Sequence, residues 1–162
     1  MVATMEKNSA ADAPVKVGTR QFVTFYLSGH LFGVDVIHVQ EVIRAQAMTR
    51  VPLATPVVSG LINLRGQIVL AIDLRLRLGL AARKSDAPVM NLVAQTSDGP
   101  VSLLVDEIGD VIEVGADVFE QSPDMLKGVQ RELVEGVYKL KSTLLIALNV
   151  NRVIQVGGPS ES

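Results

Sequence analysis

The chain contains no cysteine and only two histidines among its 162 residues. Disulfide bonds and thiolate metal sites are therefore excluded, and a reducing compartment is compatible with the composition. His30 falls in a predicted hairpin turn, where we expect an exposed polar side chain. His38 has Asp35 and Glu41 three residues away on either side, but this spacing is a weak metal signal. We therefore predict a solvated His38 and no metal site.

Sequence motifs for catalysis and phosphate binding are also missing. No G-x-S-x-G, GxxxxGK[ST] or GxGxxG is present, and these are the motifs that mark nucleophilic serines and phosphate loops. One acidic cluster, Asp106, Glu107 and Asp110, has the composition of a catalytic carboxylate pair. Because these residues alternate with valine and isoleucine, we interpret them as the solvated face of a hairpin. The sequence favours a binding module over an enzyme, with no catalytic residues and no cofactor.

Long hydrophobic runs and a basic surplus are absent too. The longest apolar runs have five residues, as in 68–72 and 144–148, whereas a membrane-spanning helix needs roughly twenty. The net charge of −2 disfavours nucleic-acid binding and attachment to an anionic membrane. The first 21 residues show no apolar segment of a signal peptide. We expect a soluble, cytoplasmic protein.

The domain organisation follows from where the polar, small residues lie. Residues 1–19 are small, polar and alanine-rich, and 157–162 are similar, so we predict a disordered tail at each end. Residues 20–156 then form one domain. Aromatic residues make up only 4% of the chain, so its core must consist mainly of valine, leucine and isoleucine, of which the β-branched residues favour sheets.

Strand patterns dominate this domain. Short alternating or apolar segments predict strands at 21–27, 31–34, 67–72, 90–96, 101–105, 110–114, 136–140 and 143–148. Segment 67–72 is apolar on both faces and predicts a strand buried on both sides. Many short strands separated by turn signals predict small β-barrels, with a single sandwich as the alternative.

Three helical segments and one helical turn are expected among the strands. In 35–44, Val36, Val39 and Ile43 follow a helical spacing, and Asp35 can cap the start. Asp73 and Asn149 can cap two further short helices, the first of which ends at Gly79. A short helical turn is also expected within 56–61.

The sequence Asn63-Leu64-Arg65-Gly66 places an arginine at a turn between two apolar segments. Asn63 and Gly66 tolerate the left-handed backbone that tight turns require. One interpretation is that Arg65 is simply solvated, with its stem on apolar neighbours. The other is that Arg65 is held in place, rimmed by Leu61, Ile62 and Leu64, as an anchor for a partner.

Segment 51–80, which contains two prolines, this NLRG turn, an apolar strand and a DLR helix, resembles the signature of the CheW family of bacterial chemotaxis coupling proteins. Three further segments resemble the family in the same order. Residues 21–43 are similar to its opening hairpin and V-x-E-V helix, 103–114 to its central V-D-x-V hairpin, and 136–154 to its closing strands and last helix. The resemblance covers nearly the whole predicted domain.

This resemblance implies a mainly β fold with short helices, in which two small five-stranded SH3-like β-barrels share a hydrophobic core. It implies a non-catalytic adaptor that couples chemoreceptor signalling tips to the regulatory domain of the histidine kinase CheA. The helical hairpin of the receptor is expected to dock in the groove between the barrels. Rings with other CheW copies are a further implication, and the protein would be recruited to membrane-associated receptor arrays without inserting into the membrane.

Six positions of this chain match the family's partner-binding region: Val39, Glu41, Gly60, Asn63, Arg65 and Gly66. The resemblance associates Arg65 with receptor contact and with the arrangement of the barrels. Val39 and Glu41 match positions linked to receptor binding, and Glu41 and Arg65 would provide polar handles in an apolar groove. A side chain at position 60 would crowd that groove.

Other functions remain open from the sequence. A coupling protein of another chemosensory pathway, such as twitching motility, would have the same fold and a different partner. A CheV-like protein would carry an additional receiver of roughly 120 residues, which we do not expect because few residues follow the closing helix. An enzyme on a β-barrel would need a clustered base and nucleophile.

Overall fold

The computed structural model describes residues 19–44, 46–52, 55–84, 86–115, 119–120 and 131–155. The two predicted tails lie outside the described residues, except for Thr19, with which the first strand begins. Residues 116–118 and 121–130 also lie outside them. Within the described part, the longest helices have four residues, and no helix is long and apolar enough to cross a membrane.

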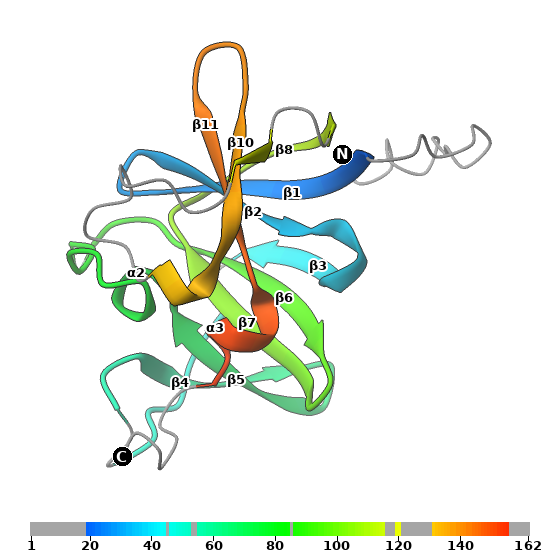
Figure 1. The fold of residues 1–162 in the computed structure, drawn as a ribbon. Coiled ribbons are helices and arrows are strands. Elements are labelled where there is room, and N and C mark those ends of the chain that lie inside the picture. The colour runs from blue at the N-terminus through cyan, green and yellow to red at the C-terminus, as the bar shows by residue number, and fades with distance from the viewer. Residues whose placement is uncertain are drawn as a thin grey trace.

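Two β-sheets make up most of the molecule, one above the other in Figure 1. The six-stranded sheet has the order β8-β1-β2-β11-β10-β9. Its strands are β1 (Thr19–Leu27), β2 (His30–Asp35), β8 (Glu107–Gly115), β9 (Phe119–Glu120), β10 (Val134–Lys139) and β11 (Leu144–Leu148). All its strand pairs are antiparallel except β2 with β11. The chain therefore leaves this sheet after β2 and returns to it at β8.

The five-stranded sheet has the order β3-β6-β7-β5-β4. Its strands are β3 (Val39–Arg44), β4 (Val58–Leu64), β5 (Gln67–Asp73), β6 (Met90–Thr96) and β7 (Gly99–Val105). Four short helices complete the described fold: η1 (Val36–His38), α2 (Leu74–Arg77), η3 (Arg131–Leu133) and α3 (Val150–Val153). The predicted mainly β class with short helices is confirmed. One sheet has six strands instead of the expected five, because the two-residue strand β9 pairs with β10.

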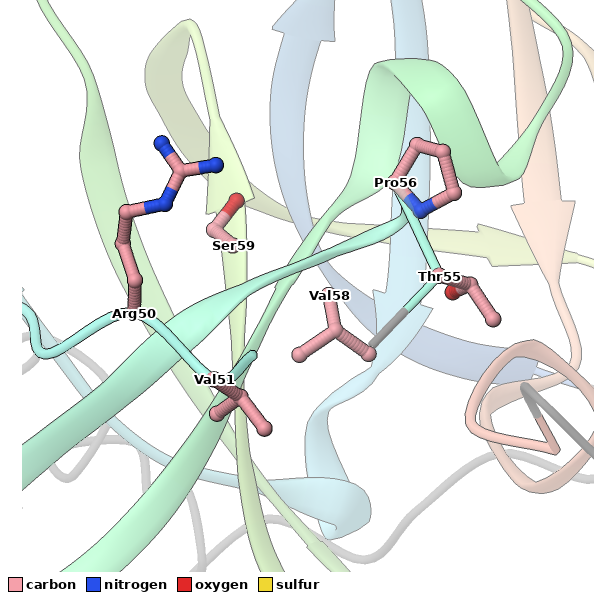
Figure 2. A pocket seen from close by; sticks show the side chains of 6 residues that line it. All are labelled: Arg50, Val51, Thr55, Pro56, Val58 and Ser59. Atoms are coloured by element: carbon pink, nitrogen blue, oxygen red, sulfur yellow. The ribbon is translucent and has the colours of Figure 1, made fainter. Parts of the chain in front are cut away.

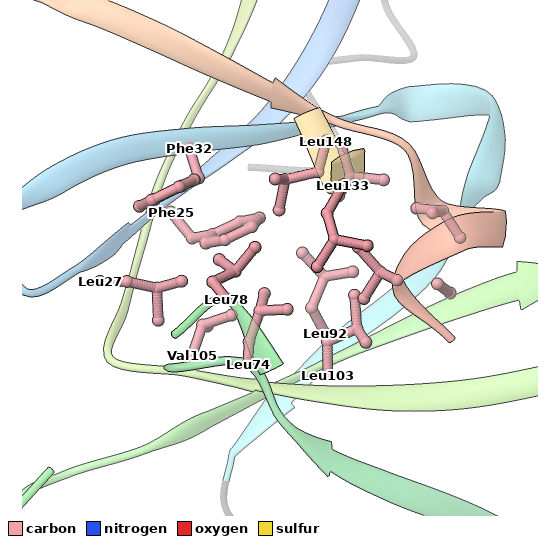
Figure 3. Packing of buried hydrophobic residues seen from close by; sticks show 14 of the residues in the cluster. Phe25, Leu27, Phe32, Leu74, Leu78, Leu92, Leu103, Val105, Leu133 and Leu148 are labelled. Atoms are coloured by element: carbon pink, nitrogen blue, oxygen red, sulfur yellow. The ribbon is translucent and has the colours of Figure 1, made fainter. Parts of the chain in front are cut away.

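A shared hydrophobic core lies between the two sheets. Phe25 and Phe32 enter it from the six-stranded sheet, with their rings stacked at a centroid distance of 6.2 Å. Leu92 and Leu103 enter it from the five-stranded sheet. Figure 3 shows these side chains converging from both sides. The packing therefore agrees with the prediction that two β units share one hydrophobic core.

The alternation of side chains along each strand also builds a second and a third core. In β6, Leu92 belongs to the shared core and the next residue, Val93, to a cluster within the five-stranded sheet. A separate cluster within the six-stranded sheet includes Phe22 and Leu145. Because successive residues of a strand point to opposite faces, one strand can supply two cores.

The predicted helix over 35–44 is wrong. Only η1 (Val36–His38) is helical, and the chain then enters β3, which pairs with β6. The segment is rich in β-branched residues, which fit a pleated sheet, and Val39–Arg44 pairs antiparallel with β6, with one register shift between Val39 and Glu41. The predicted cap is present, since the side chain of Asp35 accepts a hydrogen bond from the Ile37 amide at 3.1 Å.

Two smaller predictions also fail. The helical turn expected within 56–61 is replaced by a turn at 56–57 and the start of β4 at Val58. The strand over 67–72 is present, but Ile68 is 61% exposed, so its first residues are not buried on both sides. Burial in this strand begins at Val69 and includes Ala71 and Ile72.

The two other predicted helices are confirmed. Asp73 caps α2 by accepting a hydrogen bond from the Leu76 amide at 3.3 Å, and Gly79 follows the helix with a left-handed φ of 84°. Asn149 caps α3 in the same way, accepting from the Arg152 amide at 3.1 Å. Short polar side chains at these positions satisfy amides that a helix start leaves free.

Candidate functional site

The turn between β4 and β5 holds Arg65 in an unusual backbone conformation. Arg65 and Gly66 have φ angles of 55° and 87°, which is the pattern of a two-residue type I′ turn. Asn63 accepts a hydrogen bond from the Gly66 amide at 2.8 Å. From the sequence we expected Asn63 and Gly66 to take the left-handed conformation. Gly66 does, but the second left-handed residue is Arg65 and not Asn63. A left-handed arginine costs about 1 kcal/mol, so other contacts must offset this cost.

Arg65 forms a bidentate ion pair with Glu41 of β3. Its two terminal nitrogens donate to the two carboxylate oxygens at 2.5 and 2.6 Å. The hydrogen bonds from Arg65 lower the pKa of Glu41, and Glu41 raises the pKa of Arg65. The side chain of Arg65 remains 68% exposed and that of Glu41 20% exposed. The pair is thus a fixed, solvent-facing feature whose planar geometry is set by both partners.

This pairing changes both interpretations drawn from the sequence. Arg65 is not simply solvated, because Glu41 binds it from 24 residues away. Nor are the two residues separate handles, because each neutralises the other. Ile62 and Leu64 are buried within the five-stranded sheet and do not rim the turn, while Leu61 is half-buried. A partner would therefore meet a paired arginine and glutamate at this surface.

Gly60 allows a close approach between β4 and the segment that follows β3. Thr49 and Leu61 exchange two backbone hydrogen bonds of 2.9 and 2.8 Å. A Cβ atom at position 60 would lie only 2.6 Å from the carbonyl oxygen of Thr49. Real Cβ atoms do not approach backbone oxygen so closely. Gly60 is thus required by a backbone contact, which differs from the groove-crowding effect expected from the sequence.

We use the term seam for the Glu41–Arg65 ion pair together with the Thr49–Leu61 bridge. In the seam, the ion pair connects β3 to the turn after β4, and the bridge connects β4 to the segment that follows β3. β3 and β4 are the two outer strands in the order of the five-stranded sheet. Five of the six predicted site residues lie on it or beside it: Glu41, Gly60, Asn63, Arg65 and Gly66. Val39 lies two residues before Glu41 in β3, where it is half-buried and packs against the shared core.

Sequence reasoning missed a second polar cluster around Asp106. Arg75 donates to both oxygens of Asp106 with contacts as short as 2.6 Å, and Arg83 donates at 3.0 Å. The amide of Ser28 also donates to Asp106, at 3.0 Å. Burial raises the pKa of Asp106, but hydrogen bonds from Arg75, Ser28 and Arg83 outweigh it, so the net shift is downward.

This cluster corrects the prediction for the acidic residues near position 106. Glu107 and Asp110 are exposed, as expected, but Asp106 is paired and largely buried, with a side chain 21% exposed. The DLR and V-D motifs contain the two residues of this pair: Arg75 lies in α2 and Asp106 lies between β7 and β8. Their pairing could not be inferred from spacing alone, since Arg75 and Asp106 are 31 residues apart.

A pocket of about 450 Å³ lies at the start of β4, at the opposite end of that strand from Arg65. Figure 2 shows the residues that line it: Arg50, Val51, Thr55, Pro56, Val58 and Ser59. None of the six predicted site residues is among them. The pocket therefore belongs to the connection between β3 and β4, and two of its residues, Arg50 and Ser59, are next to Thr49 and Gly60 in the sequence.

No metal-binding group was found among the residues that the structure describes, where no three histidine, cysteine or acidic side chains come together. His30 is exposed in the β1–β2 hairpin and His38 is half-buried in η1. The described residues thus form a domain of two packed sheets with a fixed ion pair at its surface.

Comparison with known proteins identifies the family to which this domain belongs. The model of the CheW-like domain matches residues 21–157. The chain is 32% identical over 145 residues to the chemotaxis protein CheW of Bacillus subtilis, covering 88% of this chain and 90% of the relative. It is 29% identical over 146 residues to the chemotaxis protein CheW of Treponema pallidum, covering 86% of each chain.

A solved structure agrees with this result. The crystal structure of the scaffolding protein TtCheW from Thermoanaerobacter tengcongensis superimposes with a TM-score of 0.78 at 27% identity, covering 86% of this chain and 94% of that chain. The chain belongs to the CheW family and is a non-catalytic scaffold of the chemotaxis type.

Proposed function

We propose that this protein couples the cytoplasmic signalling tips of chemoreceptors to the histidine kinase CheA. The family match over 21–157 is the observation that carries this proposal. In this role the protein works in the cytoplasm at receptor arrays and provides only binding surfaces. Additional copies of the chain would extend the contacts between receptors and kinases into rings.

The seam supports a specific place for the receptor contact. Arg65 is exposed and yet fixed, because its backbone is set by the turn and its guanidinium by Glu41. A fixed arginine loses little conformational freedom when a partner binds. We propose that Arg65 and Glu41 contact the receptor helices, with Val39 beside them, and that Gly60, Asn63 and Gly66 hold the backbone of this surface.

Reconstitution of the signalling complex tests the coupling role. Purified protein, a receptor signalling fragment and CheA would be mixed, and kinase autophosphorylation would be followed over time. Strong activation is expected only when all three components are present. Binding to the receptor fragment and to CheA would be measured separately by co-sedimentation, because contacts of this kind are weak in isolation and strengthened by avidity.

The results of these experiments distinguish a failure of the coupling role from a coupling role in another chemosensory pathway. Absence of binding to both partners by a folded protein would contradict the proposal. Activation of a kinase from another chemosensory system, with none of CheA, would assign the same adaptor role to that pathway. A charge-matched variant at an exposed position outside the seam, Arg44→Glu, serves as the control for changes in the seam.

A further inference from the structure

Helix α2 occupies a position between the two sheets. It follows β5 of the five-stranded sheet directly, and its Leu74 is buried in the shared core. Two arginines, Arg75 and Arg77, extend from it in the sequence LRLR. Each arginine binds an element that is directly connected to a strand of the six-stranded sheet, and each does so through a different set of groups.

The first contact is made by Arg75. Asp106 lies between β7 of the five-stranded sheet and β8 of the six-stranded sheet. Arg75 grips its carboxylate with Nε and Nη2, and a further nitrogen donates to the carbonyl of Ala81 at 3.1 Å. The same carboxylate accepts from Ser28 in the β1–β2 turn, and the Asp106 amide donates to the carbonyl of Tyr26 in β1 at 3.2 Å. One residue therefore ties α2 to the first hairpin of the other sheet.

The second contact is made by Arg77. Its guanidinium donates to the carbonyls of Val153 at 2.7 Å, Arg152 at 2.9 Å and Gln155 at 3.1 Å. These carbonyls lie at the C-terminal end of α3, which follows β11 of the six-stranded sheet. Carbonyl oxygens near a helix end carry partial negative charge and have lone pairs left for a further donor, so a cation there is favourable.

We propose that α2 is a two-armed clasp that fixes how the six-stranded sheet sits on the five-stranded sheet, with Arg75 and Arg77 as its arms. The clasp is a property of the fold and does not rest on the coupling role. Its two arms bind two different segments, Asp106 at the β7–β8 junction and the carbonyls at the end of α3, and two points of attachment restrain rotation as well as separation of the sheets.

The physical argument depends on what the rest of the interface can do. The shared core is aliphatic and aromatic, and its attraction is non-directional. Such an interface holds two sheets together, yet it tolerates small rotations when side chains repack. Hydrogen bonds between a guanidinium and fixed carboxylate or carbonyl oxygens are directional. The polar arms therefore determine orientation, whereas the core provides cohesion.

Distance measurements between spin labels test this clasp directly, and the absence of native cysteine makes labelling specific. One label pair, Glu113→Cys with Asp98→Cys, reports between the sheets, and a second pair, Arg44→Cys with Asp98→Cys, reports within the five-stranded sheet. These positions are exposed. Each pair would be combined with Arg75→Gln and Arg77→Gln together, and the distance distributions compared with those of the parent pairs.

We expect the distribution between the sheets to shift or broaden in the double variant, while the distribution within the sheet stays unchanged. Arg50→Gln, a matched change at an exposed arginine, should leave both distributions unchanged. An unchanged distribution between the sheets would overturn the clasp, and so would equal broadening of both pairs, which would indicate general loosening. If the double variant does not fold, Arg75→Lys with Arg77→Lys keeps the charges, removes the forked geometry and is judged by the same two distributions.

Discussion

Glu41 lies in β3 and Arg65 in the turn that follows β4, and β3 and β4 are the two outer strands of the five-stranded sheet. The two side chains nevertheless form a bidentate ion pair with contacts of 2.5 and 2.6 Å. The sheet must curve for these strands to meet. Thr49, in the segment that follows β3, forms a further bridge to Leu61 of β4. An arginine at a turn thus links the two outer parts of the sheet and presents a fixed charge pair to solvent, which is the surface that we propose for the receptor contact.

Arg65→Glu is expected to weaken binding of the receptor fragment by roughly tenfold or more, because it places two carboxylates together and reverses the charge shown to a partner. Arg65 is mostly exposed, so the melting temperature should change little. Binding would be measured by titration calorimetry and melting by circular dichroism. Binding equal to that of the parent protein would contradict the proposed receptor contact.

The charge swap Glu41→Arg with Arg65→Glu separates the pair from its orientation. The swap keeps an ion pair between β3 and the turn, so its melting temperature should equal that of the parent. If Arg65 itself contacts the receptor, binding should stay weak in the swapped protein. Recovery of full binding would show that the partner requires only a closed seam, and would contradict a direct contact by Arg65.

Gly60→Ala should destabilise the domain by about 1–3 kcal/mol, because the new Cβ would overlap the Thr49 carbonyl and force the bridge apart. Gly66→Ala is the matched control, since its φ is also positive but a Cβ there meets nothing within 4 Å. The free energy of unfolding of that variant should fall by only about 1 kcal/mol, because alanine is strained at a positive φ. Urea denaturation compares the two, and an equal loss in both would exclude the close approach as the cause.

Asp106→Asn should lower the free energy of unfolding by about 2–4 kcal/mol, because it leaves Arg75 and Arg83 without their shared anion in a largely buried site. Glu107→Gln, at the exposed neighbouring position, should change it by less than about 0.5 kcal/mol. Both values come from chemical denaturation at neutral pH. A loss below about 1 kcal/mol in Asp106→Asn would place the cluster among ordinary surface pairs.

Acid should destabilise the protein through Asp106 and Glu41, whose pKa values are lowered by their arginine partners. A carboxyl with a lower pKa in the folded state binds fewer protons there than in the unfolded chain. Its stabilising contribution is therefore complete above the unfolded pKa, about 4, and is lost as the pH falls through the folded pKa. Unfolding free energies measured from pH 7 down to pH 3 should fall less steeply for Asp106→Asn than for the parent. Equal slopes would contradict this role.

The success and failure of the sequence predictions follow from how local each feature is. The caps at Asp73 and Asn149 were predictable because they depend on residues three positions apart. The helix expected over 35–44 was not, because the periodicity of Val36, Val39 and Ile43 competes with pairing to β6, which is distant in sequence. A short apolar segment cannot reveal which partner strand is available.

The candidate site shows the same division. The sequence by itself determined a mainly β domain, the NLRG turn, the absence of thiol chemistry and the family, since these depend on composition, local turn geometry and motif order. Only the tertiary structure decided that Glu41 binds Arg65, that Gly60 is required by Thr49, and that Asp106 is partly buried between two arginines. The physical reason is that each of these contacts joins segments brought together by sheet curvature and packing, and no local pattern encodes which distant charge will be the partner.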